Sequence, residues 1–148
     1  MTTRREARRL AIDVLYQADI TDRSPSDVLT GWREADREIP PFAEELVDGV
    51  VEHGPEIDLL LEEHAEGWTV SRMTALDRTI MRVAVEELLR GDVPPSVAIS
   101  EAVEAASELS AEESRSFVNG VLGRIAREIG IEDRAQPIDV PDPGAAGA

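Results

Sequence analysis

The sequence contains no cysteine among its 148 residues. This absence excludes disulfide bonds, zinc sites with thiolate ligands and a cysteine nucleophile. It is typical of a protein that works in a reducing compartment, and we expect a cytoplasmic location. The sequence also lacks a signal peptide and any run of the roughly 20 apolar residues that a membrane-spanning helix requires. We therefore expect no membrane among its partners.

Aromatic residues and positive charge are both scarce. Aromatic residues make up only 3% of the chain, so alanine, valine, leucine and isoleucine must form the core. The 15 basic residues face 31 acidic ones, which gives a net charge of −16 at pH 7. This balance argues against broad, non-specific binding of polyanions. Any contact with nucleic acid must therefore depend on a local cluster of basic residues.

Helical patterns recur along the chain, whereas strand patterns do not. Apolar residues follow the i, i+3, i+4, i+7 spacing of an amphipathic helix over residues 4–19. Similar stripes, separated by proline and glycine, predict further helices over residues 25–34, 42–53, 57–66, 76–89, 97–109 and 118–129. Ser71 is a candidate N-cap for the helix that contains residues 76–89. The length and these patterns predict one all-α domain, a bundle of about seven helices, over residues 1–132. Residues 133–148 are rich in proline, alanine and glycine, and we expect them to form a disordered tail.

Four of the basic residues lie close together in RREARR, residues 4–9. On a helical wheel, Arg5, Arg9 and Tyr16 lie on one face, while Arg4 and Arg8 lie between that face and the apolar stripe. Guanidinium groups bind phosphates, and an aromatic ring can stack on a base, which is worth roughly 1–3 kcal/mol. This arrangement is a candidate surface for single-stranded nucleic acid. The alternative is a solvated helix face on which Tyr16 packs against another helix.

A second candidate region is ESRSFVNGVLGR, residues 113–124. Ser114, Arg115 and Phe117 lie together near the start of the last predicted helix, and they could extend the same surface. The alternative is that Phe117 belongs to the core.

Catalytic patterns are poor. His53 and His64 lie 11 residues apart on either side of Gly54-Pro55, and no third ligand recurs at helical spacing, so we expect no metal site. The acidic pairs diverge by 100° on a helix, and we interpret them as solvated faces: Glu62-Glu63, Glu86-Glu87 and Glu112-Glu113. We therefore expect neither an enzyme nor a bound cofactor.

Several segments, in order, resemble the transcription antitermination factor NusB family: RREARRLAIDVLYQAD, ELVDGVVEH, SRMTALDRTIMRVAVEELL, DVPPSVAISEAVEAASEL and SRSFVNGVL. The resemblance covers roughly residues 4–129. It implies an all-helical fold of two small subdomains without catalytic activity. It also implies binding of boxA RNA together with NusE, a small-subunit ribosomal protein. Within the RNA polymerase antitermination complex, this pair would suppress premature termination in ribosomal RNA operons.

The resemblance also implies which residues contact RNA. On the first helix they are Arg4, Arg5, Arg8, Arg9 and Tyr16. At the start of the last helix they are Ser114, Arg115 and Phe117, beside Glu113, and in the middle helix Arg72 and Arg78 are further candidates. Glu6 and Ser116 depart from the family pattern, and both reduce the positive charge. The alternative function is a helical protein-interaction or self-association module without direct RNA contact, and a homodimer of this kind could bury the face of Arg4 and Arg8.

Overall fold

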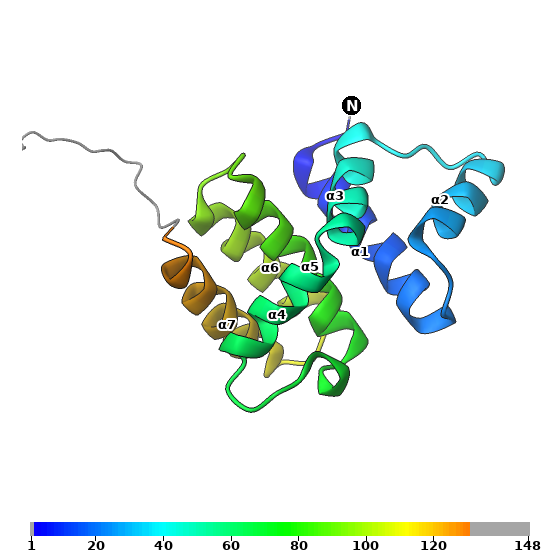
Figure 1. Cartoon of the computed structure of the whole chain (residues 1–148). Coiled ribbons are helices and arrows are strands. Elements are labelled where there is room, and N and C mark those ends of the chain that lie inside the picture. Colours follow the sequence, from blue (N-terminus) through cyan, green and yellow to red (C-terminus); the bar gives the residue numbers. More distant parts are fainter. Residues whose placement is uncertain (1, 131–148) are drawn as a thin grey trace, which may run out of the picture.

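The computed structural model describes residues 2–130, which form helices and connecting loops without strands (Figure 1). A short 3-10 helix, η1, precedes α5. The elements are α1 (Arg4–Thr21), α2 (Pro25–Glu34), α3 (Pro41–Glu52), α4 (Gly54–His64), η1 (Val70–Arg72), α5 (Ala75–Arg90), α6 (Pro95–Leu109) and α7 (Ser114–Glu128). The prediction of an all-α bundle is confirmed. The predicted tail, residues 133–148, lies outside the described residues.

Short polar side chains fix where several helices begin. The Thr3 hydroxyl accepts a hydrogen bond from the Glu6 backbone N–H, and the Glu6 carboxylate bonds the Thr3 N–H in return, which forms a capping box for α1. The Ser24 hydroxyl accepts a hydrogen bond from the Asp27 backbone N–H and caps α2. The predicted cap of α5 is wrong: Ser71 lies inside η1, and Thr74 caps α5 instead. Both residues are good N-caps, and the intervening 3-10 turn moves the start of α5 to the later one.

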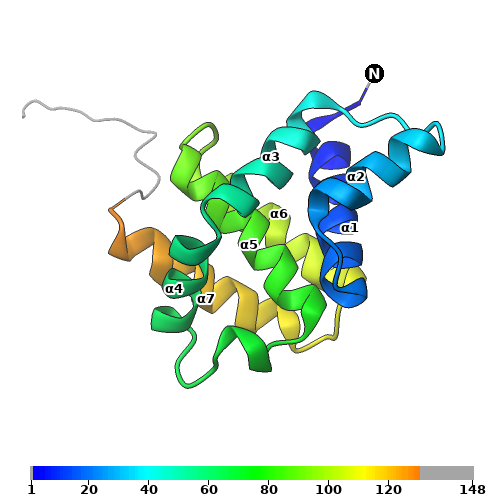
Figure 2. The same ribbon diagram turned by 45° about the vertical axis from the view of Figure 1, so that its right-hand side comes forward.

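α5 is the central helix of the molecule. It packs against α1 and α3 on one side and against α4, α6 and α7 on the other. The helices α1–α3 form one group and α4–α7 the other, which agrees with the predicted two subdomains (Figure 2). The largest fully buried hydrophobic side chains are aliphatic or methionine, namely Leu46, Ile57, Leu61, Ile80, Met81, Leu122 and Ile125.

The central position of α5 also buries charge. Glu86 and Glu87 are only 1% and 3% exposed, so the interpretation of this pair as a solvated face is wrong. Glu87 binds Arg8 of α1, and Glu86 binds His53 at the junction of α3 and α4. Gly49 of α3 leaves room for the Glu86 carboxylate. Because other helices cover α5 on opposite sides, two adjacent glutamates reach different buried partners.

Candidate nucleic-acid interface

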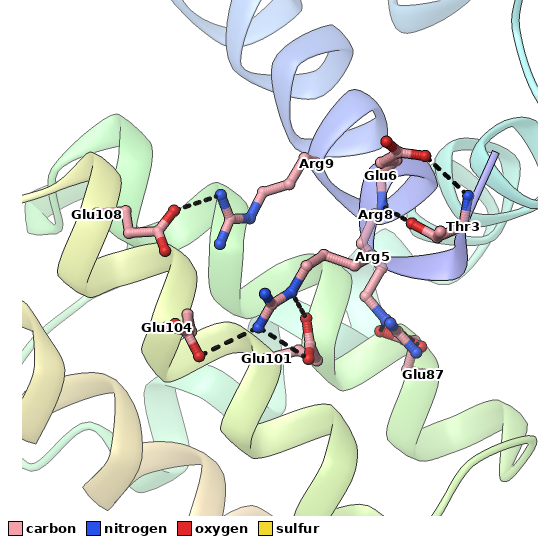
Figure 3. A network of polar contacts seen from close by, with 9 residues as sticks. All are labelled: Thr3, Arg5, Glu6, Arg8, Arg9, Glu87, Glu101, Glu104 and Glu108. Carbon is pink, nitrogen blue, oxygen red and sulfur yellow. Dashed lines mark hydrogen bonds and ion pairs between the residues drawn. The ribbon is translucent and has the colours of Figure 1, made fainter.

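The arginines at the start of α1 face a row of glutamates on α6 (Figure 3). Arg5 Nε lies 3.1 Å from Glu101 Oε1, and Arg5 Nη2 lies 3.1 Å from Glu104 Oε1. One turn further along α1, Arg9 Nη1 lies 2.8 Å from Glu108 Oε1. In the free protein, carboxylates therefore occupy the guanidinium donors of the predicted cationic face. A nucleic acid on this face would use the same donors to bind its phosphates.

These ion pairs lie at the surface. The side chains of Arg5, Glu104 and Glu108 are each about half exposed, and that of Arg9 is 25% exposed. The hydrogen bond from Arg9 lowers the pKa of Glu108, and the hydrogen bond to Glu101 raises the pKa of Arg5. Exposed pairs of this kind are typically worth about 0.2–1 kcal/mol, so another anion can replace the carboxylates at little cost.

Arg4 and Arg8 differ from Arg5 and Arg9 in their surroundings, although all four belong to RREARR. Arg8 is only 7% exposed, and its Nε lies 2.8 and 2.9 Å from the two carboxylate oxygens of Glu87. Its guanidinium is enclosed between α1 and α5, which argues against the expected RNA contact of Arg8. Arg4 is exposed, and its guanidinium stacks over the Phe42 ring at 4.3 Å from the ring centre.

Further along α1, Tyr16 is half-buried and Ile12 is fully buried, so the face that carries Arg5 and Arg9 becomes less accessible toward the C-terminal end of the helix. Arg78 is also engaged within the protein. Its Nε donates to Asp19 at 2.8 Å and its Nη1 donates to the Met73 carbonyl at 2.9 Å. Its donors join α1 to the start of α5, and the expected RNA contact at Arg78 stays a prediction.

The start of α7 contains one buried and two accessible candidates. Ser114 is 4% exposed and donates to Asp77 at 2.9 Å, which argues against the RNA contact expected of it. Arg115 is exposed, and its Nη1 lies 3.2 Å from the Ser107 hydroxyl. Phe117 is half-buried and packs against the core, so the core alternative holds for part of its ring.

The arginines of α1 and the candidates at the start of α7 meet at the last turn of α6. Arg115 of α7 binds Ser107, and Arg9 of α1 binds the adjacent Glu108. A single strand that contacts α1 can therefore continue over this turn to the start of α7.

The structure adds groups that the sequence reasoning missed. The Trp68 ring is 46% exposed, and it meets the Phe117 ring edge-on at 6.1 Å between ring centres, while the Arg72 guanidinium lies over it at 5.5 Å. An isolated tryptophan in a loop has no periodicity that could reveal its neighbours. The glutamates on α6 did carry a signal, since residues 101, 104 and 108 follow helical i, i+3, i+7 spacing.

Residues 2–130 contain no group of three or more histidine and carboxylate side chains that could hold a metal ion. None of the helices placed by the structure is long and apolar enough to cross a membrane.

Comparison with known proteins agrees with the all-helical fold. The NusB family model matches residues 5–127. The transcription antitermination protein NusB of Saccharopolyspora erythraea is 50% identical over 139 residues, which cover 90% of this chain and 91% of that protein. NusB of T. maritima has a similar structure, with a TM-score of 0.76, 32% identity, and coverage of 86% of this chain and 92% of that one. A chain in a crystal structure of the antitermination factors NusB and NusE with double-stranded RNA gives a TM-score of 0.75 at 28% identity, over 84% and 96% of the two chains. The chain belongs to the NusB family.

Proposed function

We propose that this protein is a transcription antitermination factor that binds boxA RNA together with NusE. In this role it helps RNA polymerase to transcribe ribosomal RNA operons without premature termination. Membership of the NusB family supports the proposal, as does the relative that was crystallised with NusE and RNA. The role requires binding and no catalysis, and it places the protein in the cytoplasm, where bacterial transcription occurs.

The RNA surface that we propose leaves out the buried Arg8 and Ser114, and also Arg78, whose donors bind Asp19 and the Met73 carbonyl. It consists of Arg4, Arg5, Arg9, Tyr16, Arg72, Arg115 and Phe117. The observation that carries it is the pairing of Arg5 and Arg9 with exposed carboxylates. An RNA phosphate has the charge and the acceptor oxygens to replace a carboxylate on a guanidinium fork. The phosphates of the RNA strand therefore bind guanidinium donors that the fold already holds in place.

The same geometry explains why a partner is needed. Near the start of α1, Arg5, Arg8 and Arg9 lie among five carboxylates, from Glu6, Glu87 and the three glutamates of α6 (Figure 3). This neighbourhood has no net positive charge that could attract RNA over a distance. NusE, a basic ribosomal protein, supplies positive charge beside it in the complex.

The test is boxA RNA binding by the full chain, with and without NusE, over a series of salt concentrations. We expect Arg5→Ala/Arg9→Ala to weaken binding and to make the salt dependence shallower, by about 0.7 in log–log slope for each lost phosphate contact. The control is Arg33→Ala/Arg127→Ala, which removes the same charge at exposed positions on α2 and α7. Equal binding by the Arg5/Arg9 variant and the wild type at every salt concentration would contradict the proposed surface.

A further inference from the structure

We propose that Phe42 is a positioning residue for RNA binding, which holds Arg4 in place as the first contact for an RNA phosphate. This inference rests on the proposed function, because the ligand is the RNA that we propose for the arginines of α1. The Arg4 guanidinium lies over the Phe42 ring at 4.3 Å from the ring centre. Phe42 belongs to α3, so the contact connects the start of α1 to a different helix.

Arg4 differs from the other arginines of RREARR in the state of its N–H donors. Arg5, Arg8 and Arg9 each donate to at least one glutamate. Within residues 2–130, Arg4 makes no hydrogen bond or ion pair with another side chain, and its contact with Phe42 uses the flat face of the guanidinium. The N–H donors at the edge of this group are therefore available to a phosphate without the displacement of a carboxylate.

The space beside Arg4 can accept a phosphate. A cavity of about 500 Å³ lies between the start of α1 and the connection from α2 to α3, and Arg4 and Phe42 both line it. Glu38 also lines this cavity and repels a phosphate. The first residues of α3 line it as well, and no side chain caps this helix, so the positive end of its dipole offsets the repulsion.

The Phe42 ring restricts the conformations of the Arg4 side chain. Arg4 is exposed at the first position of α1, and a long side chain at such a position samples many rotamers in the absence of a partner. The half-buried ring selects the rotamers that hold the guanidinium over α3. A cation–π contact at an exposed site raises the population of the held conformers by about two- to fivefold.

The difference between these arginines predicts the order of events in RNA binding. Arg4 can bind a phosphate at the first encounter, whereas Arg5 and Arg9 must exchange their carboxylates before they can do so. Exposed charges that act during the encounter control the association rate and its salt dependence. We therefore expect Arg4, held by Phe42, to control the association rate, and Arg5 and Arg9 to control mainly the dissociation rate.

Stopped-flow mixing of fluorescently labelled boxA RNA with the full chain and NusE measures both rates. We expect Phe42→Leu, which retains an apolar side chain, to lower the association rate constant about two- to fivefold and to leave the dissociation rate constant nearly unchanged. Arg4→Gln should lower the association rate constant at least as much and make its salt dependence shallower. Phe42→Tyr is the matched control, because it retains the ring and should associate like the wild type. An unchanged association rate in Phe42→Leu, or an effect confined to dissociation, overturns the proposal.

A double-variant cycle separates positioning from a purely structural role, since Phe42 also packs against the core. If Phe42 acts through Arg4, the double variant Arg4→Gln/Phe42→Leu should associate no more slowly than Arg4→Gln alone. A further decrease in the double variant would show that Phe42 acts through the fold, and the proposal would be wrong.

The same measurements separate this inference from the proposed function. If Arg5→Ala/Arg9→Ala weakens RNA binding while Phe42→Leu and Arg4→Gln associate like the wild type, the inference is wrong and the proposed function stands. If none of these variants is impaired, both fail.

Discussion

At the residue scale, arginine performs three different tasks within RREARR. Arg8 is enclosed with Glu87, Arg4 stacks on Phe42, and Arg5 and Arg9 meet the surface glutamates of α6. The chain has no lysine, so arginine supplies all 15 of its basic side chains. The planar guanidinium suits each task, since it can bind carboxylates through several donors and can stack on rings.

We predict that Arg8→Met destabilises the fold without removing an RNA contact. The substitution leaves the Glu87 carboxylate, which is 3% exposed, without its cation, and breaking a buried pair in this way typically costs about 3–5 kcal/mol. The double variant Arg8→Met/Glu87→Leu should recover most of the lost stability, and it should bind RNA with the affinity of the wild type. Urea unfolding and RNA titration measure the two quantities. A stable Arg8→Met variant with weakened RNA binding would show that Arg8 contacts RNA after all.

The second buried carboxylate of α5 has a titratable partner. His53 Nδ1 lies 2.8 Å from Glu86 Oε1, and the His53 side chain is 39% exposed while that of Glu86 is 2% exposed. A side chain at Gly49 would collide with the Glu86 carboxylate, so the glycine permits this close approach. The hydrogen bond and the charge of Glu86 raise the pKa of His53 above 6.5, and the nearby Glu52 and Glu56 add to the effect.

This pair should make stability depend on pH. Because the pKa of His53 is higher in the folded than in the unfolded protein, its contribution is complete below about pH 6.5 and is lost as the pH rises through the folded pKa. We expect the free energy of unfolding to fall between pH 6 and pH 9 more steeply for the wild type than for His53→Gln. Urea unfolding at several pH values measures this difference. Parallel pH profiles for the two proteins would contradict the role of the His53–Glu86 pair.

At the element scale, α6 presents an anionic edge to α1. Glu101, Glu104 and Glu108 project from one face of α6 toward Arg5 and Arg9 (Figure 3). They bind the guanidinium groups in the free protein, and at the proposed surface they would compete with RNA for the same donors. We therefore expect the contact between α1 and α6 to limit how strongly the protein binds RNA alone.

We predict that Glu104→Gln/Glu108→Gln increases RNA affinity several-fold and makes its salt dependence steeper. Both carboxylates are about half exposed, so their loss should lower stability by no more than about 1 kcal/mol. Glu34→Gln/Glu63→Gln is the matched control, because it changes the net charge equally at exposed positions on α2 and α4. RNA titration compares the three proteins. An equal gain in both variants would indicate an effect of net charge and not competition at the α1–α6 contact.

At the scale of the whole molecule, acidic residues outnumber basic ones, which gives the net charge of −16. The pairing of the arginines in RREARR reflects the same excess of acidic residues. Every guanidinium of RREARR lies against a carboxylate or an aromatic ring, so the bundle presents no free cationic surface there. An electronegative protein of this kind suits a basic partner, since complementary charge accelerates association. We expect such a pair to hold RNA more tightly than the free bundle does.

Most of the fold follows from local patterns. Proline and glycine divide the sequence into segments, and the apolar spacing within each segment predicts its helix. The start of α5 was misplaced because Ser71 and Thr74 are both suitable caps, and the 3-10 turn between them depends on packing. The burial of Glu86 and Glu87 was also missed, since only the packing of other helices around α5 reveals their partners.

The sequence by itself determined the helical bundle, the family and the clustering of arginines in the first two turns of α1. Only the tertiary structure decided which of these arginines remain accessible. Successive residues on a helix point 100° apart, so Arg8 and Arg9 face different neighbours although they are adjacent in the chain. Arg8 meets a buried carboxylate on α5 and is enclosed, whereas Arg9 meets an exposed carboxylate on α6 and can exchange it for a phosphate.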